Sequence, residues 1–156
     1  MIRARALDVV GTLARLGLAA VWLVSGALKA VDPDQTFVAV RAYDVLPSIG
    51  VEVVAAVLPY VELALGLLLL VGVGTRIVAV MALLLLLVFV AGVSQAWARG
   101  LSIDCGCVGG GGAVDPGHTA YVQEILRDTG FLVLAGWLIL RPRTLFSIDS
   151  RYSGRT

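Results

Sequence analysis

The chain has 156 residues, of which 59% are hydrophobic and only 15% charged, and its mean hydropathy is +0.95. Soluble domains contain about 45–50% apolar and about 25% charged residues, so this composition excludes an ordinary soluble domain and makes lipid the expected surroundings. A formal net charge of +1, without a clustered basic patch, excludes a nucleic-acid partner. We therefore expect a multi-pass protein of the plasma membrane.

Four apolar stretches are long enough to cross a hydrocarbon core of about 30 Å as helices that rise about 1.5 Å per residue. They predict an all-α, integral-membrane four-helix bundle in contact with the lipid bilayer. We expect residues 1–145 to form a single membrane domain and residues 146–156 to form a cytoplasmic tail. The four spans are expected near residues 9–31, 51–73, 77–98 and 121–141.

Polar and helix-breaking residues separate these spans. The first should stop at Asp32-Pro33-Asp34, because proline disfavours helical geometry in the preceding residue and aspartate is costly in lipid. Residues 35–49 are too interrupted to span and predict a short interfacial helix, whereas Gly72 to Arg76 predict a tight turn. The last helix should begin at Thr119, capped by that threonine.

The outer third of that last helix is polar, so we expect it to face the bundle and the preceding loop rather than lipid. The residues concerned are Gln123, Glu124, Arg127 and Asp128.

An even number of spans places both termini on the same side of the membrane. Most arginines then fall on that side, and the positive-inside rule assigns it to the cytoplasm. The loop after the third span is consequently extracytoplasmic, where disulfides form and persist. The basic residues on the side of the termini are Arg3, Arg5, Arg76, Arg141, Arg143, Arg151 and Arg155, against Lys29, Arg41 and Arg99 on the other side.

This loop holds the two cysteines of the chain, in Cys105-Gly106-Cys107. Gly106 supplies the backbone freedom that brings two sulfurs together, and so small a ring should be strained. Strained and exposed disulfides exchange readily, which favours a redox-active pair with Cys105 and Cys107 as its catalytic residues. A bridge over one residue would stabilise the fold very little. Cysteines that stay reduced, or that merely close a local turn, are the structural alternative.

A metal site is a second alternative for the same loop. Cys105, Cys107 and the sole histidine, His118, offer three ligands, and Asp104 or Asp115 a fourth. The spacing is not one of the usual zinc patterns, so we expect no metal. His118 is otherwise a solvated loop residue or a base for a thiol. The glycine run at residues 109–112 predicts a hinge, since no Lys-Ser/Thr follows it as a phosphate loop requires.

Glu62 lies near the middle of the second span, where an ionised carboxylate is expensive. We expect Arg15 of the first span to be its partner. The pair is either a register-fixing ion pair or a functional group, such as a proton relay or the polar anchor of a quinone head group. We expect Lys29 to form an interfacial cluster with Asp32 or Glu52.

Six short motifs occur in order along most of the chain: Arg15-Leu16-Gly17, Ser25 to Lys29, Asp32-Pro33, Tyr43 with Leu46-Pro47, Pro59 to Gly66, and Ile103 to Gly109. In this order, with Cys-Gly-Cys after the third apolar stretch, they resemble the MauE family of membrane proteins, the methylamine-utilisation type, which is related to DoxX-like membrane proteins. Val108 stands where that family usually has phenylalanine, and the glycine run is longer than expected.

The resemblance implies a four-helix membrane protein that transfers electrons for disulfide formation or maturation of extracytoplasmic proteins, often alongside a thioredoxin-like partner. In the namesake pathway of methylamine metabolism, that means maturation of methylamine dehydrogenase. Our first hypothesis is therefore a thiol–disulfide redox protein that passes electrons between an extracytoplasmic thioredoxin-like protein and a membrane quinone. The alternative is a non-catalytic subunit or assembly factor of a larger membrane complex, packed through small residues. Those residues are Gly11, Gly17, Ala20 and Gly26.

Overall fold

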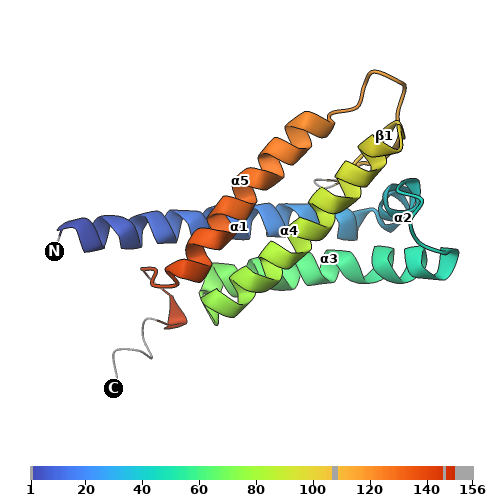
Figure 1. Ribbon diagram of the computed structural model, residues 1–156. Coiled ribbons are helices and arrows are strands. Elements are labelled where there is room, and N and C mark those ends of the chain that lie inside the picture. Colours follow the sequence, from blue (N-terminus) through green and yellow to red (C-terminus); the bar gives the residue numbers. More distant parts are fainter. Residues whose placement is uncertain (1, 107–108, 146, 150–156) are drawn as a thin grey trace.

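The computed structural model describes residues 2–106, 109–145 and 147–149, which form long helices and one small sheet (Figure 1). In chain order the elements are α1 (Ile2–Val31), α2 (Pro33–Ala42), α3 (Ser48–Val71), α4 (Thr75–Ala98), β1 (Ile103–Asp104), β2 (Gly112–Ala113) and α5 (Tyr121–Leu140).

Three helices within the described ranges are long and apolar enough to cross a membrane, so the protein is a multi-pass membrane protein. They are Arg5–Val31 within α1, Ser48–Val71 (α3) and Thr75–Ala98 (α4). The helix α5 is not among them, because Glu124, Arg127 and Asp128 interrupt its N-terminal half. A fourth span at α5 therefore stays a prediction.

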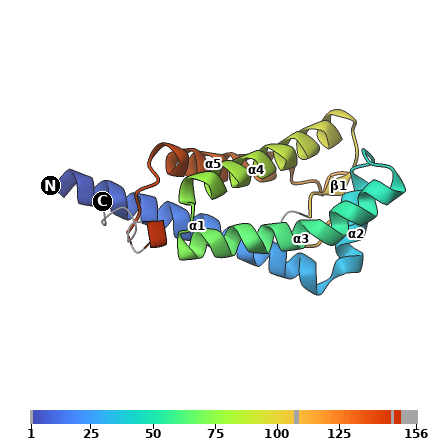
Figure 2. The same cartoon turned by 90° about the horizontal axis from the view of Figure 1, so that it is seen from below.

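The long helices form two antiparallel pairs, α1 with α3 and α4 with α5 (Figures 1 and 2). Glycines let α1 and α3 approach closely. A Cβ on Gly26 would lie 2.8 Å from the carbonyl oxygen of Pro59, and one on Gly66 would lie 2.9 Å from the backbone nitrogen of Leu23. Small residues at such contacts are the usual basis of helix packing in lipid. Gly17, by contrast, has no atom within 4 Å of its added Cβ, so this member of the predicted packing face does not pack inside the protein.

All four long helices contribute to the main apolar core. Small side chains make up much of it, and the apolar residues on the outer faces of the helices are exposed, as expected where lipid replaces water. The core residues are Ala14, Leu18, Ala19, Trp22, Leu65, Leu69, Val78, Ala79, Ala82, Leu86, Ala135 and Leu138.

The predicted breaks between helices are mostly confirmed. The helix α1 ends at Val31, and Asp32 Oδ1 accepts a hydrogen bond from the backbone N–H of Gln35 (3.0 Å), which caps α2. Gly72 and Gly74 make the tight turn before α4, both in the left-handed region at φ +73° and +58°. The helix α1 begins earlier than the apolar stretch it contains.

The predicted start of α5 is wrong. The helix begins at Tyr121, and the residue before it, Ala120, offers no side-chain cap, so Thr119 does not cap it. A tertiary contact holds this end instead, because the Tyr121 hydroxyl accepts a hydrogen bond from the backbone N–H of Ile103 (3.1 Å) and donates one to the carbonyl of Leu101.

The cysteine-containing loop and the α3–α4 turn lie at opposite ends of the bundle. The segment with β1 and β2 lies beside α2, whereas the α3–α4 turn lies near Arg15 of α1 and the end of α5 (Figure 1). This arrangement separates the cysteine-containing loop from the terminal segments.

Candidate functional site

A two-stranded antiparallel sheet holds the cysteine-containing loop in place. Ile103 of β1 pairs with Ala113 of β2, and Asp104 pairs with Gly112. The sequence gives no indication of these strands, since each has only two residues.

The glycines of the loop have a packing role that the hinge prediction did not include. A Cβ on Gly111 would lie 2.6 Å from the Cβ of Ala39 on α2, and the Gly111 carbonyl accepts a hydrogen bond from Gln35 Nε2 (2.6 Å). Gly111 also has a positive φ of +103°, which a side chain would strain. Glycine is therefore required where the loop lies against α2.

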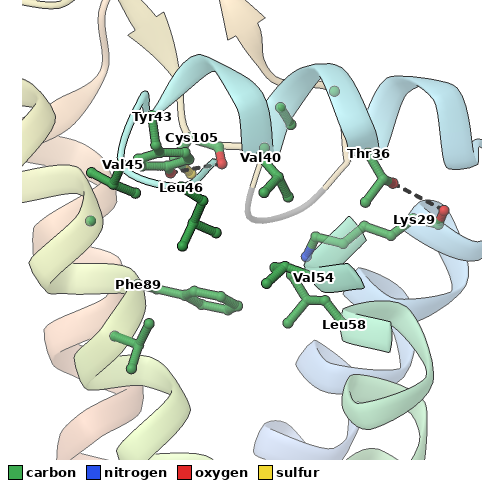
Figure 3. A pocket seen from close by; sticks show the side chains of 15 residues that line it. Lys29, Thr36, Val40, Tyr43, Val45, Leu46, Val54, Leu58, Phe89 and Cys105 are labelled. Carbon is green, nitrogen blue, oxygen red and sulfur yellow. Dashed lines mark hydrogen bonds between the residues drawn. The ribbon is translucent and has the colours of Figure 1, made fainter. Parts of the chain in front are cut away.

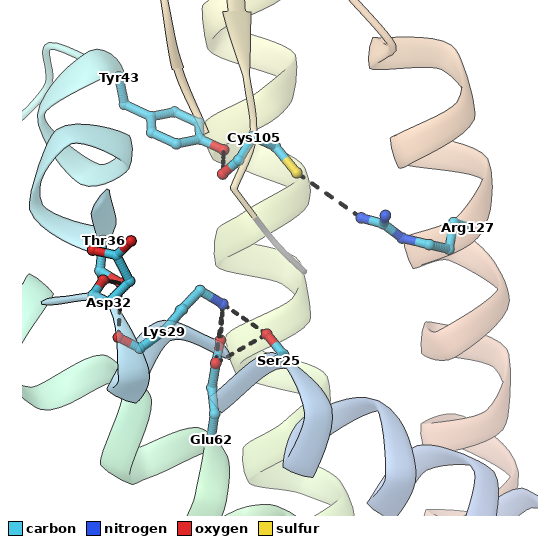
Figure 4. Close-up of polar contacts among 8 residues, drawn as sticks. All are labelled: Ser25, Lys29, Asp32, Thr36, Tyr43, Glu62, Cys105 and Arg127. Atoms are coloured by element: carbon cyan, nitrogen blue, oxygen red, sulfur yellow. Dashed lines mark hydrogen bonds and ion pairs between the residues drawn. The ribbon is translucent and has the colours of Figure 1, made fainter. Parts of the chain in front are cut away.

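Cys105 is buried between α2 and α5, with 7% of the residue exposed. Its carbonyl oxygen accepts a hydrogen bond from the Tyr43 hydroxyl (2.9 Å), and its sulfur points the other way, toward α5 (Figure 4). There, Arg127 Nη2 lies 3.9 Å from Cys105 Sγ. The Cys105 sulfur therefore has a guanidinium beside it.

Two buried carboxylates lie one turn apart on α5, and the first of them, Glu124, is beside this sulfur. Glu124 Oε1 accepts a hydrogen bond from the backbone N–H of Cys105 (3.4 Å), and Asp128 Oδ1 pairs with Arg127 Nε (3.2 Å). Glu124 Oε2 and Asp128 Oδ2 are buried and have no hydrogen-bond partner in the described part of the chain. The prediction that this polar third of α5 faces the protein is confirmed for Glu124 and Asp128, which are 6% and 3% exposed, but Gln123 is exposed.

Three possible metal ligands meet at this point, although not the predicted set. One ligand atom from each of Asp104, Cys105 and Glu124 lies within 4.8 Å of the other two. A cation also lies beside this cluster, since Arg127 Nη2 is 3.9 Å from the Cys105 sulfur.

The other predicted loop residues are placed less fully. Cys107 lies outside the described residues. His118 is exposed after β2, where its backbone N–H donates to the carbonyl of Asp115 (3.0 Å) and it lines a shallow surface depression with Asp115.

Glu62 is paired with Lys29, and the predicted Arg15 partner is wrong. Glu62 is fully buried and Lys29 is 6% exposed. Lys29 Nζ lies 2.7 Å from Glu62 Oε1 and 3.0 Å from Oε2, and it also donates to Ser25 Oγ at 2.7 Å (Figure 4). Lys29 is therefore part of the buried site rather than of an interfacial cluster with Asp32 or Glu52.

Arg15 instead binds at the C-terminal end of α3. Its Nη1 donates to the carbonyls of Leu69 (2.7 Å) and Leu70 (2.9 Å), and its Nη2 donates to the carbonyl of Leu145 (3.2 Å). A guanidinium is well placed there, because the last carbonyls of a helix lack partners within the helix and carry partial negative charge. Arg15 thus links α1, α3 and the segment after α5.

A cavity of about 160 Å³ lies between the Cys105 region and the Lys29–Glu62 pair. Side chains from α2, α3 and α4 form most of its wall, among them Val40, Leu58 and Phe89 (Figure 3). Lys29 and Cys105 both contribute to the wall. The cavity therefore brings together the two parts of the sequence that predicted chemistry.

Sequence reasoning missed Arg127, Tyr43 and Lys29 as members of this site. The spacing of Glu124, Arg127 and Asp128 at three and four residues was a usable signal, since it puts them on neighbouring positions of one helix surface. Their polarity predicted that they face the loop, but which of them lies beside Cys105 had no sequence signal, because it depends on how the loop folds back onto α5.

Comparison with known proteins identifies the family. No curated protein and no solved structure matched the chain. The family described as methylamine utilisation protein MauE matches residues 7–141, which include most of α1, the other long helices, the loop and all described residues of the site. This confirms the resemblance seen in the sequence motifs: the chain belongs to the MauE family.

Proposed function

We propose that this protein is a membrane thiol–disulfide redox protein. Cys105 and Cys107 pass electrons between an extracytoplasmic thioredoxin-like protein and a membrane quinone, in support of disulfide formation or protein maturation. The main support is the position of Cys105, whose sulfur lies beside Arg127 and whose residue lines the cavity that also contains Lys29. The family's description makes methylamine utilisation the first process in which to look for this activity.

The chemistry balances as a two-electron exchange. The thiols of Cys105 and Cys107 form a disulfide and release two electrons and two protons, and a quinone takes up both to become a quinol. The dithiol of the thioredoxin-like partner then reduces the Cys105–Cys107 disulfide, and this leaves a disulfide in the partner. Thiolate attack on a disulfide sulfur is the step that moves electrons between the two proteins.

The residues around Cys105 have separate roles in this proposal. Arg127 stabilises the thiolate and offsets the nearby negative charge of Asp104. Glu124 accepts the thiol proton, because its carboxylate lies within 4.8 Å of the sulfur and one of its oxygens has no partner among the described residues. The buried Cys105 serves the cavity side of the exchange, so we assign partner contact to Cys107.

The proposed orientation has the termini in the cytoplasm and the cysteine-containing loop outside. It is supported by the distribution of arginines and by the separation of the loop from the α3–α4 turn. Cysteine labelling in spheroplasts tests it: in a background without Cys105 and Cys107, Ala113→Cys should react with an impermeant maleimide and Arg76→Cys should react only after lysis. Both positions are exposed. The reverse pattern would overturn the orientation.

The central experiment follows the thiols of the reduced protein in liposomes. Adding a quinone should convert them to a disulfide, read as loss of alkylation by mass spectrometry, while quinol appears in the absorbance spectrum in equal amount. Cys105→Ser and Cys107→Ser should each abolish both signals. Normal quinol formation by either variant would overturn the proposal. Cysteines that stay inert in the wild-type protein would also overturn it and favour a non-catalytic subunit.

A further inference from the structure

We propose that the cavity between α2, α3 and α4 binds the ring of a prenylated quinone that enters sideways from the bilayer. This inference rests on the redox function proposed above and assigns its electron acceptor to a site. Size, access and the chemistry of the wall each support it.

The size of the cavity fits one substituted six-membered ring. Its volume is about 160 Å³. An engineered apolar cavity of about 150 Å³ in another protein binds benzene, which sets the scale for a single ring. A whole prenylated quinone is much larger, so the tail has to leave the protein.

Apolar and exposed side chains lie at the edge of the cavity. Val45, Leu46 and Val88 are 56%, 41% and 64% exposed. Val88 lies on the membrane-spanning helix α4, so its exposed side chain faces hydrocarbon, whereas Val45 and Leu46 lie in the loop after α2. We therefore place the route of entry at Val88, where a ring enters from lipid and its isoprenoid tail stays in lipid.

The wall of the cavity distinguishes a quinone from a plain hydrocarbon. Most of it is apolar, with the Phe89 ring across from Lys29, whose Nζ lies 5.6 Å from the ring centroid (Figure 3). A buried cation in the wall does not stabilise a bound hydrocarbon. It does stabilise the carbonyl oxygens of a quinone, because they accept hydrogen bonds and gain negative charge on reduction.

The two residues that the reaction needs both line the cavity. Cys105 lines it with its sulfur on the side toward Arg127, and Lys29 provides a positive charge that is held in place by Glu62 and Ser25. Ligand sites of this kind are mostly apolar and have a few placed polar groups. A ring bound between these two residues is stabilised by the charge of Lys29 and lies next to the residue that carries the thiol.

Photolabelling with an azidoquinone tests the site without any thiol chemistry. Liposomes that contain the Cys105→Ser variant, which cannot form the disulfide, should still be labelled on α2 or α4. Adding Gly92→Leu, which places a large side chain in the cavity wall, should lower labelling about tenfold or more. Ala91→Leu is the matched control: the neighbouring residue on α4 is exposed and does not line the cavity, so labelling should not change.

Two further arms keep the result interpretable. Val88→Phe changes only the exposed edge of the cavity and should lower labelling by blocking entry. It replaces Gly92→Leu as the test if thermal unfolding shows that Gly92→Leu misfolds. A prenol with the same tail but no quinone ring should not compete with the label. Equal labelling of the Gly92→Leu and Ala91→Leu proteins, or full competition by the prenol, would overturn the proposed ring site.

The two proposals fail in different ways. Labelling of the cavity together with inert cysteines would overturn the redox function and leave a quinone-binding site. Quinone-dependent thiol oxidation that persists in a folded Gly92→Leu protein would overturn the cavity assignment and leave the redox function.

Discussion

Lys29 and Glu62 form an ion pair that is almost completely removed from solvent. Their closest atoms are 2.7 Å apart, and Ser25 donates a hydrogen bond to Glu62 Oε2 at 3.0 Å. Removing two charges from water is costly, so a buried ion pair is weak evidence that it stabilises the fold. Replacing both members by apolar residues often leaves the stability unchanged. Removing one member is different, because it leaves an uncompensated charge in the interior.

We predict that Lys29→Met destabilises the protein by about 3–5 kcal/mol, whereas the double variant Lys29→Met with Glu62→Leu recovers most of that loss. Unfolding of the purified protein in detergent, followed by circular dichroism, measures both. Arg99→Met is the control, since its ion pair with Asp44 is exposed and should contribute less than about 1 kcal/mol. A Lys29→Met protein as stable as the wild type would contradict the prediction.

The Arg127 guanidinium is expected to control how fast Cys105 reacts. In a reduced Cys107→Ser background, Arg127→Gln should slow modification of Cys105 by a small methanethiosulfonate about tenfold. That corresponds to about 1.4 kcal/mol, at the low end for a hydrogen bond to a charged group because the contact is 3.9 Å long. Arg99→Gln, with the same change of charge at an exposed site, should leave the rate unchanged. Equal rates in the two variants would show that Arg127 does not stabilise the thiolate.

Among the elements, α1 and α3 are packed most closely, and glycine makes this possible. Backbone atoms of α3 occupy the position where Gly26 would carry a side chain, so the helices must separate if one is added. The same helix carries Gly17 on an open face, where an added methyl group meets nothing within 4 Å. Gly17 and Gly26 therefore differ in what faces them.

Gly26→Ala should destabilise the fold by about 1–3 kcal/mol, the usual cost of overpacking, and Gly17→Ala should be neutral or slightly stabilising. Both variants raise helix propensity equally, so their difference isolates the packing effect. Thermal unfolding in the same detergent compares them. The prediction fails if the two variants melt together.

At the scale of the whole molecule, the segment after α5 fastens the end of the bundle opposite the cysteine-containing loop. Asp149 accepts hydrogen bonds from the backbone N–H groups of Gly74 (2.9 Å) and Thr75 (2.8 Å), so it caps α4 from a distant part of the chain. Arg15 joins the same end through the carbonyl of Leu145. Burial raises the pKa of the Asp149 carboxyl, but the hydrogen bonds from Thr75 and Gly74 and the Arg15 charge outweigh it and hold that pKa below its ordinary value.

This lowered pKa predicts how the contact depends on pH. A carboxyl whose pKa is lower in the folded than in the unfolded state stabilises the fold above the unfolded value of about 3.9, and the contribution is lost as the pH falls through the folded value. Asp149→Asn should therefore cost about 0.3–1 kcal/mol near neutral pH, the usual contribution of a negative charge at a helix N-terminus. The stabilities of variant and wild type, measured by unfolding in detergent, should converge below about pH 4. A difference that stays constant with pH would contradict the role of the ionised carboxyl.

Hydrophobicity and local chemistry determined much of this protein from the sequence alone. The membrane setting, three of the spans, the break at Asp32 and the Gly72–Gly74 turn each depend on residues close together in the chain, because lipid solvation and backbone preferences act locally. The motif order also indicated the MauE family, which the match over residues 7–141 confirmed. Glu62 was recognised for a local reason as well, since any carboxylate inside an apolar span is unusual.

Only the tertiary structure decided which residues meet. Arg15 and Lys29 lie on the same helix, and either was available to Glu62 until the register of α1 against α3 put Lys29 beside it and Arg15 at the end of α3. Cys105 likewise lies beside Arg127 and Glu124 because two short strands and Tyr121 fold the loop back onto α5. Such pairings follow from close packing of distant segments, and helix periodicity or composition carries no information about which segments pack together.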